Sequence, residues 1–376
     1  MLAPIIMLKK QASLLILSTL LWGPQVSAEH PPTPKKCKIA VLTELTGAGA
    51  ALGAECKNGA LIAIEAQTAR PVGAQRGCVP ELVFGDTQDD VKAAVNEFRS
   101  VILDPAVYAV VVSRSKTAMP LNPLSESSQV PLFASAAHPL LLSGNKYALR
   151  AYISADTEGS FLAAYAAKLN LKTFSTVTIE DEWNTALTAA FDKKLKELGG
   201  SVLAEDTLVP TEQDFGATIG KLLKAKPQAI FMNLQLAQAG PFLRRLRDLG
   251  GNSAVLSNYW VQKPEVLRAA GDAAVEGVRF GEIDYAQPRF VSAARQHADN
   301  VTAGTYICYV ATTAAIDSFS LVSGEITRQS YSETIDKLRA VELLDGVLPV
   351  RDREIQYPLV AREIKHSSVV TVGGLN

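Results

Sequence analysis

Short apolar segments rich in β-forming residues alternate with helix-like segments along the first part of this 376-residue chain. Helical patterns follow at residues 50–67, after Asp90, and at 115–128. Strand–helix alternation of this kind produces parallel strands whose two faces are both covered by helices. The pattern predicts an α/β fold. The predicted strands are KIAVL (38–42), ELVFGD (81–86), YAVVV (108–112) and VPLFA (130–134).

The same alternation starts again after the segment ALRAYIS (148–154). We expect Asp156 to cap the next helix, and Gly199-Gly200 to end the one that follows. A mature chain of about 350 residues is long for one core. The chain therefore predicts two α/β lobes, with a helix at 305–322 and C-terminal strands shared between them. The predicted strands of this half are STVTI (175–179), SVLAEDT (201–207), QAIFMN (228–233) and AVLSN (254–258).

A glycine-rich loop, ELTGAGAALG (44–53), lies between the first strand and the first helix. Its Gly47-x-Gly49-x-x-x-Gly53 spacing is one residue longer than the dinucleotide-binding pattern. The next strand ends at Asp86, too far along for the acidic residue that this pattern requires. The loop favours close approach of the backbone to a small ligand, with a tight turn and no ligand contact as the alternative.

The N-terminus has the order of a secretory signal peptide. Lys9 and Lys10 precede an apolar core, and the small residues Val26-Ser27-Ala28 precede Glu29. The core is too short for a membrane span, which needs about 20 residues. We predict cleavage after Ala28 and a periplasmic mature protein, with an N-terminal anchor helix as the alternative.

Charge and motifs exclude several classes of function. Residues 1–28 contain two lysines and no acid, so the rest has 35 basic and 38 acidic side chains, a net charge of −3. This balance favours neither nucleic acid nor anionic membrane as a partner. The sequence contains no C-x-x-C, G-x-S-x-G, H-E-x-x-H or Walker pattern. We therefore expect no metal site, no cofactor and no enzymatic activity.

Two of the four cysteines are placed for a disulfide. Cys37 precedes the first strand, and Cys78 lies three residues before the second. A right-handed βαβ unit sets the starts of these strands about 4.8 Å apart, within the Cα separation that a disulfide requires. We predict a Cys37–Cys78 disulfide and expect Cys56 and Cys308 to be buried thiols inside helices.

The segment KIAVLTELTGAGAALGAECKNGALIAIEA (38–66) resembles the first strand, loop and helix of type I periplasmic solute-binding proteins. More narrowly, it resembles the branched-chain amino acid and amide (Leu/Ile/Val-binding protein-like) group that serves ABC importers. Residues 109–139 and 175–233 are similar to later parts of the same proteins.

The resemblance implies two Rossmann-like lobes with parallel sheets, joined by three crossovers, with a ligand cleft between them. The crossovers should lie near Arg150, Ile283 and Leu344. The expected division is residues 29–150 in lobe 1, 151–283 in lobe 2, 284–343 back in lobe 1, and 344–376 mostly in lobe 2.

The resemblance also implies the ligand-binding residues of lobe 1. Leu52 matches a position that lines the apolar end of the ligand. Ser115, at a helix start, and the backbone N–H of Ala136 would bind a carboxylate. His138 would donate to the same group.

Three residues of lobe 2 complete the expected site. Trp183 would cover the ligand as the lobes close, and Gln235 would line the pocket. Tyr259 lies where amino-acid-binding relatives have an acid for the ammonium group of the ligand. Its neutral phenol favours a carboxylate, aromatic or short and branched, over a zwitterionic amino acid. An acid at 180–182 is the alternative partner for an ammonium group.

The implied function is capture of a small molecule outside the cytoplasm and its delivery to an ABC permease, by a protein that we expect to be a monomer. An extracytoplasmic sensor of the same fold is the alternative. A hydrolase that uses Ser115 and His138 is disfavoured, because the resemblance places both residues against the anion of a bound ligand.

Overall fold

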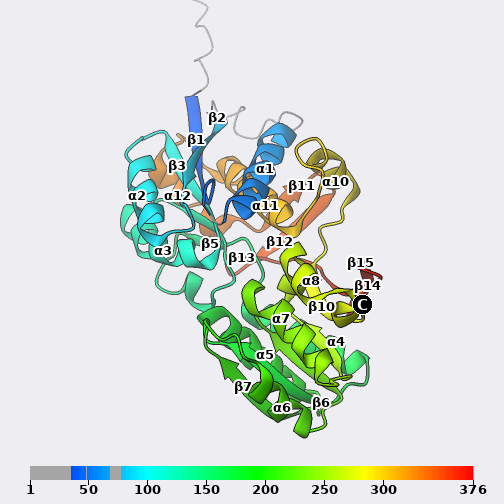
Figure 1. Cartoon of the computed structure of the whole chain (residues 1–376). Coiled ribbons are helices and arrows are strands. Elements are labelled where there is room, and N and C mark those ends of the chain that lie inside the picture. Colours follow the sequence, from blue (N-terminus) through cyan, green and yellow to red (C-terminus); the bar gives the residue numbers. More distant parts are fainter. Residues whose placement is uncertain (1–34, 48, 68–77, 376) are drawn as a thin grey trace, which may run out of the picture. The chain divides into compact units, whose positions relative to one another are not determined.

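The computed structural model describes residues 35–47, 49–67 and 78–375, which fold into two sheets flanked by helices (Figure 1). The predicted signal peptide lies outside the described residues. Most strand pairs are parallel, as the alternation predicts. Within the described residues, no helix is both long and apolar enough to cross a membrane. We call each sheet with its helices a lobe.

The sheet of lobe 1 has the strand order β11-β12-β13-β5-β4-β3-β1-β2. Strands β1 to β5 are parallel, and β11 to β13 form an antiparallel extension that joins β5 through β13. The strands are β1 (Lys35–Thr43), β2 (Cys78–Asp86), β3 (Val107–Ser113), β4 (Leu132–Ser135), β5 (Ala148–Arg150), β11 (Ala340–Leu343), β12 (Gly346–Arg351) and β13 (Glu354–Ile355).

Strand β1 shows why both faces of this sheet are covered. Ile39 and Val41 belong to one hydrophobic cluster, whereas Ala40 and Leu42 belong to another, because successive side chains point to opposite faces. The first cluster includes residues of α1 and α11, and the second includes residues of α2 and α3. The helical elements of this lobe are α1 (Ala50–Ala66), α2 (Val91–Val101), α3 (Ser115–Ser128), η3 (Pro139–Leu142), α10 (Pro288–Ala294), α11 (Ala303–Ser318), η5 (Phe319–Leu321), α12 (Arg328–Ser332) and η6 (Ile335–Lys337).

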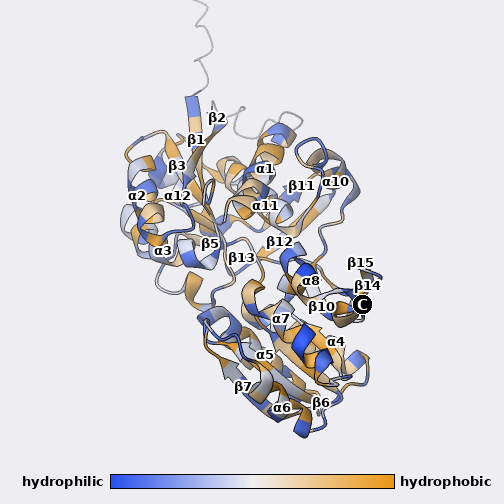
Figure 2. Ribbon diagram, viewed as in Figure 1, coloured by the Kyte–Doolittle hydropathy of each residue, from blue (hydrophilic) through white to orange (hydrophobic). Residues whose placement is uncertain are grey.

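The sheet of lobe 2 has the order β15-β14-β10-β9-β8-β6-β7. Strands β6 to β10 are parallel, and β14 and β15 add an antiparallel edge. Hydrophobic residues follow the central strands of both sheets (Figure 2). The strands are β6 (Thr173–Ile179), β7 (Ser201–Leu208), β8 (Ala229–Asn233), β9 (Ala254–Ser257), β10 (Arg279–Ile283), β14 (Leu359–Lys365) and β15 (Ser368–Gly373).

Alternation along β8 again divides the core of lobe 2 in two. Ile230 and Met232 pack in a cluster with residues of α6, α7 and α8, whereas Ala229 and Phe231 pack with residues of α4 and α5. The helical elements are α4 (Ala155–Lys168), α5 (Glu182–Glu197), α6 (Gly216–Lys224), α7 (Leu236–Asp248), η4 (Tyr259–Gln262), α8 (Pro264–Ala270) and α9 (Asp272–Val275).

The predicted Cys37–Cys78 disulfide is confirmed, with the two Cα atoms 5.8 Å apart. The prediction for the other two cysteines is wrong. Cys56 and Cys308 lie inside helices, as expected, but they bond to one another, with a Cα separation of 5.0 Å. This bond links α1 to α11, which lie side by side (Figure 1). Helices 252 residues apart in sequence meet only through the fold, so spacing alone did not reveal the pair.

Two local expectations also differ from the structure. The helix after β5 is capped by Ser154, whose hydroxyl accepts from the Thr157 N–H at 3.2 Å, and Asp156 lies in its first turn. At the C-terminus, the chain enters the sheet of lobe 2 at Leu359 rather than near Leu344. Pro358, which lacks an N–H, lies between β13 and β14, and these two strands belong to different sheets.

Candidate functional site

The lobe 1 candidates lie where parallel strands end. Ser115 is the first residue of α3, directly after β3, and is half-buried. Ala136 and His138 follow β4, which pairs with β3, and both are buried. The carboxyl ends of adjacent parallel strands share one edge of a sheet, where ligands of such folds bind. The structure therefore places these three residues at one edge.

A buried arginine fixes the loop that carries Ala136 and His138. Arg150 is 2% exposed, and its guanidinium donates to the carbonyl oxygens of Ala136 at 3.1 Å and His138 at 2.7 Å. It also donates to the Pro139 carbonyl at 3.2 Å and pairs with Glu354. From the sequence, Arg150 was expected only at a lobe boundary, because no local pattern indicates this role.

Both ring nitrogens of His138 have partners within the chain. Nδ1 accepts a hydrogen bond from the Leu140 N–H at 3.1 Å, so the proton of a neutral ring lies on Nε2. Nε2 is hydrogen-bonded to the Glu182 carboxylate, which belongs to lobe 2. A second pair between the lobes joins Glu55 to Lys263 at 3.5 Å. In this structure His138 thus contacts an acid of the opposite lobe.

Aromatic rings gather on the lobe 2 side. The Tyr259 ring lies 6.1 Å from Trp183, 4.6 Å from Trp260 and 6.3 Å from Tyr152, measured between centroids. Tyr152 comes from the segment after β5, and Tyr259 is the first residue of η4. The Trp183 Nε1–H is buried without a hydrogen-bond partner among the described residues. Trp183 and Tyr259 were predicted from the sequence as site residues, whereas Trp260 and Tyr152 were not.

A buried asparagine network holds the loops that carry these rings. Asn233 Oδ1 accepts from Asn184 Nδ2 at 2.9 Å and from Asn258 Nδ2 at 2.8 Å. Asn258 in turn accepts from the Trp260 N–H at 3.0 Å and begins η4. Asn184 is adjacent to Trp183. Asn233 and Asn258 each come directly after the apolar residues of a strand. This position could have identified them from the sequence, but they were not predicted.

Gln235 and Leu52 are placed differently from the rest. Gln235 is exposed after β8, and its side-chain amide donates to Asp181, the residue that caps α5. Leu52 is half-buried in the first turn of α1. Two glycines on either side of Leu52 are explained by close packing at Gly53 and by backbone conformation at Gly47. A Cβ on Gly53 would lie 1.9 Å from the Glu44 carbonyl oxygen, and Gly47 has a φ of +82°.

Two buried acids lie near these residues, and sequence reading identified neither. Glu44, at the end of β1, is fully buried, and its Oε2 accepts from Ser113 Oγ at 2.6 Å. Glu158, in α4, is 1% exposed, and neither of its carboxyl oxygens has a hydrogen-bond partner within the described residues. Burial, with the nearby charge of Glu282, raises the pKa of Glu158 to about 8.

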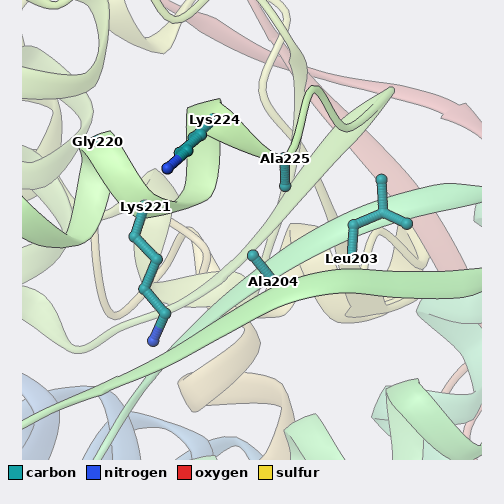
Figure 3. A pocket seen from close by; sticks show the side chains of 6 residues that line it. All are labelled: Leu203, Ala204, Gly220, Lys221, Lys224 and Ala225. Carbon is teal, nitrogen blue, oxygen red and sulfur yellow. The ribbon is translucent and has the colours of Figure 1, made fainter.

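A separate open groove lies between β7 and α6 (Figure 3). None of the predicted site residues lines it. The polar side chains that line it are two lysines, and the other lining residues are apolar or glycine, so it does not combine an anion site with aromatic rings. Its lining residues are Leu203, Ala204, Gly220, Lys221, Lys224 and Ala225.

Comparison with known proteins identifies the family. The periplasmic binding protein family matches residues 36–356, most of the chain. The chain belongs to this family. The resemblance to the Leu/Ile/Val-binding group is also confirmed: this periplasmic binding protein is 26% identical over 246 residues to Leu/Ile/Val-binding protein homolog 3 of Brucella melitensis biotype 1. That alignment covers 64% of this chain and 66% of the relative, so it spans just under two thirds of the curated relative.

Solved structures confirm the two-lobe α/β fold. A leucine binding protein from Thermotoga maritima superposes with a TM-score of 0.78 at 24% identity, covering 90% of this chain and 99% of that one. A solute binding protein of an ABC transporter from Rhodopseudomonas palustris BisB5, in complex with 3,4-dihydroxybenzoic acid, superposes with a TM-score of 0.75 at 18% identity. It covers 90% of this chain and 97% of its own. At these identities the structures establish the fold alone.

Proposed function

We propose that this chain is an extracytoplasmic solute-binding protein that captures a small organic carboxylate and delivers it to the membrane permease of an ABC importer. The observation that carries the proposal is the meeting of Ser115 and Ala136 at the ends of the paired strands β3 and β4. The first N–H groups of a helix have no intrahelical acceptor and carry partial positive charge. With the Ser115 hydroxyl, they form a suitable site for a carboxylate.

The rings of lobe 2 supply the apolar part of the site. Trp183 and Tyr259 offer flat surfaces, and Trp183 has a buried N–H without a partner in the described structure. A ligand oxygen would satisfy that donor, and an apolar ligand body would pack on the rings. Leu52 and Gln235 remain candidates for the margins of the site. One structural relative is named a leucine binding protein, and another was solved in complex with 3,4-dihydroxybenzoic acid. Both of these compounds have a carboxylate and an apolar body, which supports the proposal.

The proposed role is non-catalytic. A hydrolase at Ser115 would need a base within hydrogen-bond reach. The only histidine considered for this role, His138, has its Nδ1 occupied by the Leu140 N–H and its Nε2 by Glu182. In the ligand-bound protein, we propose that His138 exchanges Glu182 for the ligand carboxylate or supports it from this position.

Membership of the family implies an extracytoplasmic location, and two disulfides suit an oxidising compartment. We further propose that export uses residues 1–28 with cleavage after Ala28, and that the mature protein acts as a monomer. N-terminal sequencing of the exported protein tests the first point, and light scattering tests the second.

Replacement of Ser115 tests the carboxylate site. A hydrogen bond to a charged group is worth about 1.5–3 kcal/mol, so Ser115→Ala should weaken binding of a carboxylate about 10- to 150-fold. Ser127→Ala is the matched control, because Ser127 lies exposed near the other end of α3. Equal affinities of the two variants, measured by calorimetry, would place the carboxylate elsewhere.

A further inference from the structure

Three segments of lobe 2, each the end of a helix with the loop after it, meet at the amino ends of the parallel strands. Lys172 joins them: its N–H donates to the Gln228 side chain at 2.7 Å, and its carbonyl oxygen accepts from the Ser201 N–H at 2.8 Å. The predicted site residues of lobe 2 follow the strands at their other, carboxyl ends. The three segments therefore form one surface away from the proposed ligand site. They are residues 168–172 before β6, 194–200 before β7 and 224–228 before β8.

This surface is strongly basic, although the chain after residue 28 has a net charge of −3. The three segments contain six lysines and one acid, Glu197, which pairs with Lys194 at 3.1 Å. Lys168 donates to the Gly374 carbonyl oxygen at 2.8 Å. We call the other five lysines the basic surface, and four of them have no acid within ion-pair distance among the described residues. The five are Lys172, Lys194, Lys196, Lys224 and Lys226.

Helix ends explain only part of this charge. The partial negative charge at a helix C-terminus favours lysine in the last turn, which accounts for Lys194, Lys196 and Lys224. Lys172 and Lys226 lie in the loops, outside the helices. Lys226 also has a φ of +53°, in the left-handed region that favours glycine, and the equivalent position after α5 and after α7 is glycine. The chain thus has a lysine at a position where glycine would cost less.

Exposed leucine side chains lie among these lysines. Leu198, the residue that ends α5, is 43% exposed, and Leu203 on β7 is 46% exposed. Leu203 lines the open groove between β7 and α6, and Lys224 lines the same groove from α6 (Figure 3). The surface therefore combines positive charge with solvent-exposed apolar groups, which is the composition of segments that bind at a membrane interface.

We propose that the basic surface binds the headgroups of anionic phospholipids at the surface of a bilayer. Five lysines without an arginine suit the diffuse charge of lipid phosphates, whereas a specific protein carboxylate is usually bound by the planar fork of arginine. A bilayer also accommodates the exposed leucines, which a nucleic acid would leave in water. For a solute-binding protein, this contact keeps the molecule beside the membrane in which a permease lies, and it does not depend on which ligand is bound.

The test measures binding of the mature protein to lipid vesicles by co-sedimentation. One set of vesicles contains phosphatidylglycerol and phosphatidylethanolamine in equal amounts, and the other contains phosphatidylcholine alone. In about 0.01 M salt, where charges act over roughly 30 Å, we expect binding to the anionic vesicles to be at least about tenfold tighter. Raising the salt to about 1 M shortens that range to roughly 3 Å and should release the protein.

A double variant locates the contact. Each lysine near an anionic bilayer contributes about fivefold to binding, so Lys172→Gln combined with Lys226→Gln should weaken binding to the anionic vesicles about 25-fold. The matched control combines Lys92→Gln with Lys337→Gln, which removes two exposed lysines of lobe 1 and leaves the same net charge. The control should bind as the wild-type protein does. Thermal unfolding should show that both double variants are folded.

Three results would overturn the proposal. Equal binding by the two double variants would show that the vesicles are not bound through the basic surface. Equal binding to anionic and uncharged vesicles at low salt would show that lipid charge is not recognised. If the wild-type protein binds no vesicles but is retained on immobilised polyglutamate, and the Lys172 and Lys226 variant is not, the surface binds an acidic protein instead. None of these results bears on the proposed ligand site, which Ser115→Ala tests separately.

Discussion

Trp183 is the residue whose side chain reports most directly on the proposed site. Its ring contacts Tyr259, and its Nε1–H is buried without a partner in the described structure. The chain after Ala28 contains one other tryptophan, Trp260, whose ring stacks on the same tyrosine, Tyr259. The two indoles can therefore be separated by substitution.

Ligand binding should change tryptophan emission through Trp183. Trp183→Phe should remove most of the ligand-induced change, whereas Trp260→Phe should retain it. Trp183→Ala should also weaken binding by roughly 1 kcal/mol or more, about fivefold, through loss of a ring contact. Unchanged affinity in Trp183→Ala would show that the indole supports only its own lobe.

The pKa of Glu158 predicts how stability depends on pH. A carboxyl group has an ordinary pKa of 4.5, and burial raises that of Glu158 to about 8. Between these values the native state holds a proton that the unfolded state releases, so this residue makes the free energy of unfolding fall as pH rises. Glu158→Gln should therefore gain on the wild-type protein from about pH 5 to pH 8, by at most about 1.4 kcal/mol per pH unit. Parallel urea titrations at several pH values measure this, and a constant difference would contradict it.

At the scale of elements, close helix packing around glycine organises both lobes. A Cβ on Gly59 in α1 would lie 2.2 Å from the Thr305 carbonyl oxygen in α11. A Cβ on Gly159 in α4 would lie 2.4 Å from the Leu187 carbonyl oxygen in α5. The first helix of each lobe thus packs backbone to backbone against a partner, and the second of these contacts also positions Glu158.

Gly159→Ala should destabilise lobe 2 because its methyl group cannot fit without moving α5. Overpacking of this kind costs about 1–3 kcal/mol. Gly220→Ala is the control: in the described structure a Cβ there would have no neighbour within 4 Å, and alanine is favoured over glycine in a helix by about 1 kcal/mol. Denaturant titration should thus move the two variants in opposite directions. Equal stability of Gly159→Ala and the wild type would refute the packing argument.

The strands and helices were predictable where apolar periodicity was strong. β1, β3 and β8 contain continuous buried runs, and α3 begins at Ser115 as expected. The β13–β14 boundary was not predictable from periodicity, because EIQYPLVAREI (354–364) has a continuous strand-like pattern although its two halves belong to different sheets.

The site was only partly predictable, because its supporting contacts join distant segments. Arg150 reaches the loop after β4, and Cys56 reaches Cys308. Glu158 lies in an ordinary helical pattern, and only the fold buries it and brings its charge close enough to raise the pKa of Tyr259. Resemblance gave Ser115, Ala136, Trp183 and Tyr259 as candidates, whereas the acid among the aromatic residues required the structure.

At the scale of the whole molecule, the two disulfides constrain lobe 1 over very different lengths of chain. They close segments of 41 and 252 residues. In the chain-entropy account, removing the longer link costs roughly 5 kcal/mol and the shorter roughly 4 kcal/mol. Replacing Cys56 and Cys308 by alanine should therefore lower the unfolding midpoint more than replacing Cys37 and Cys78. The reverse order, measured in the same denaturant series, would show that local packing outweighs the loop length.

The central claim is that the chain binds one small organic carboxylate. The most direct measurement is a calorimetric titration of the mature protein with acids and their uncharged primary amides. We expect at least one acid to bind with one-to-one stoichiometry and a micromolar or lower Kd. Its amide should bind at least about tenfold more weakly, since the charge-assisted hydrogen bonds at Ser115 are lost. Equal binding of acid and amide, or no binding by any acid, would show that the chain has no site for a carboxylate.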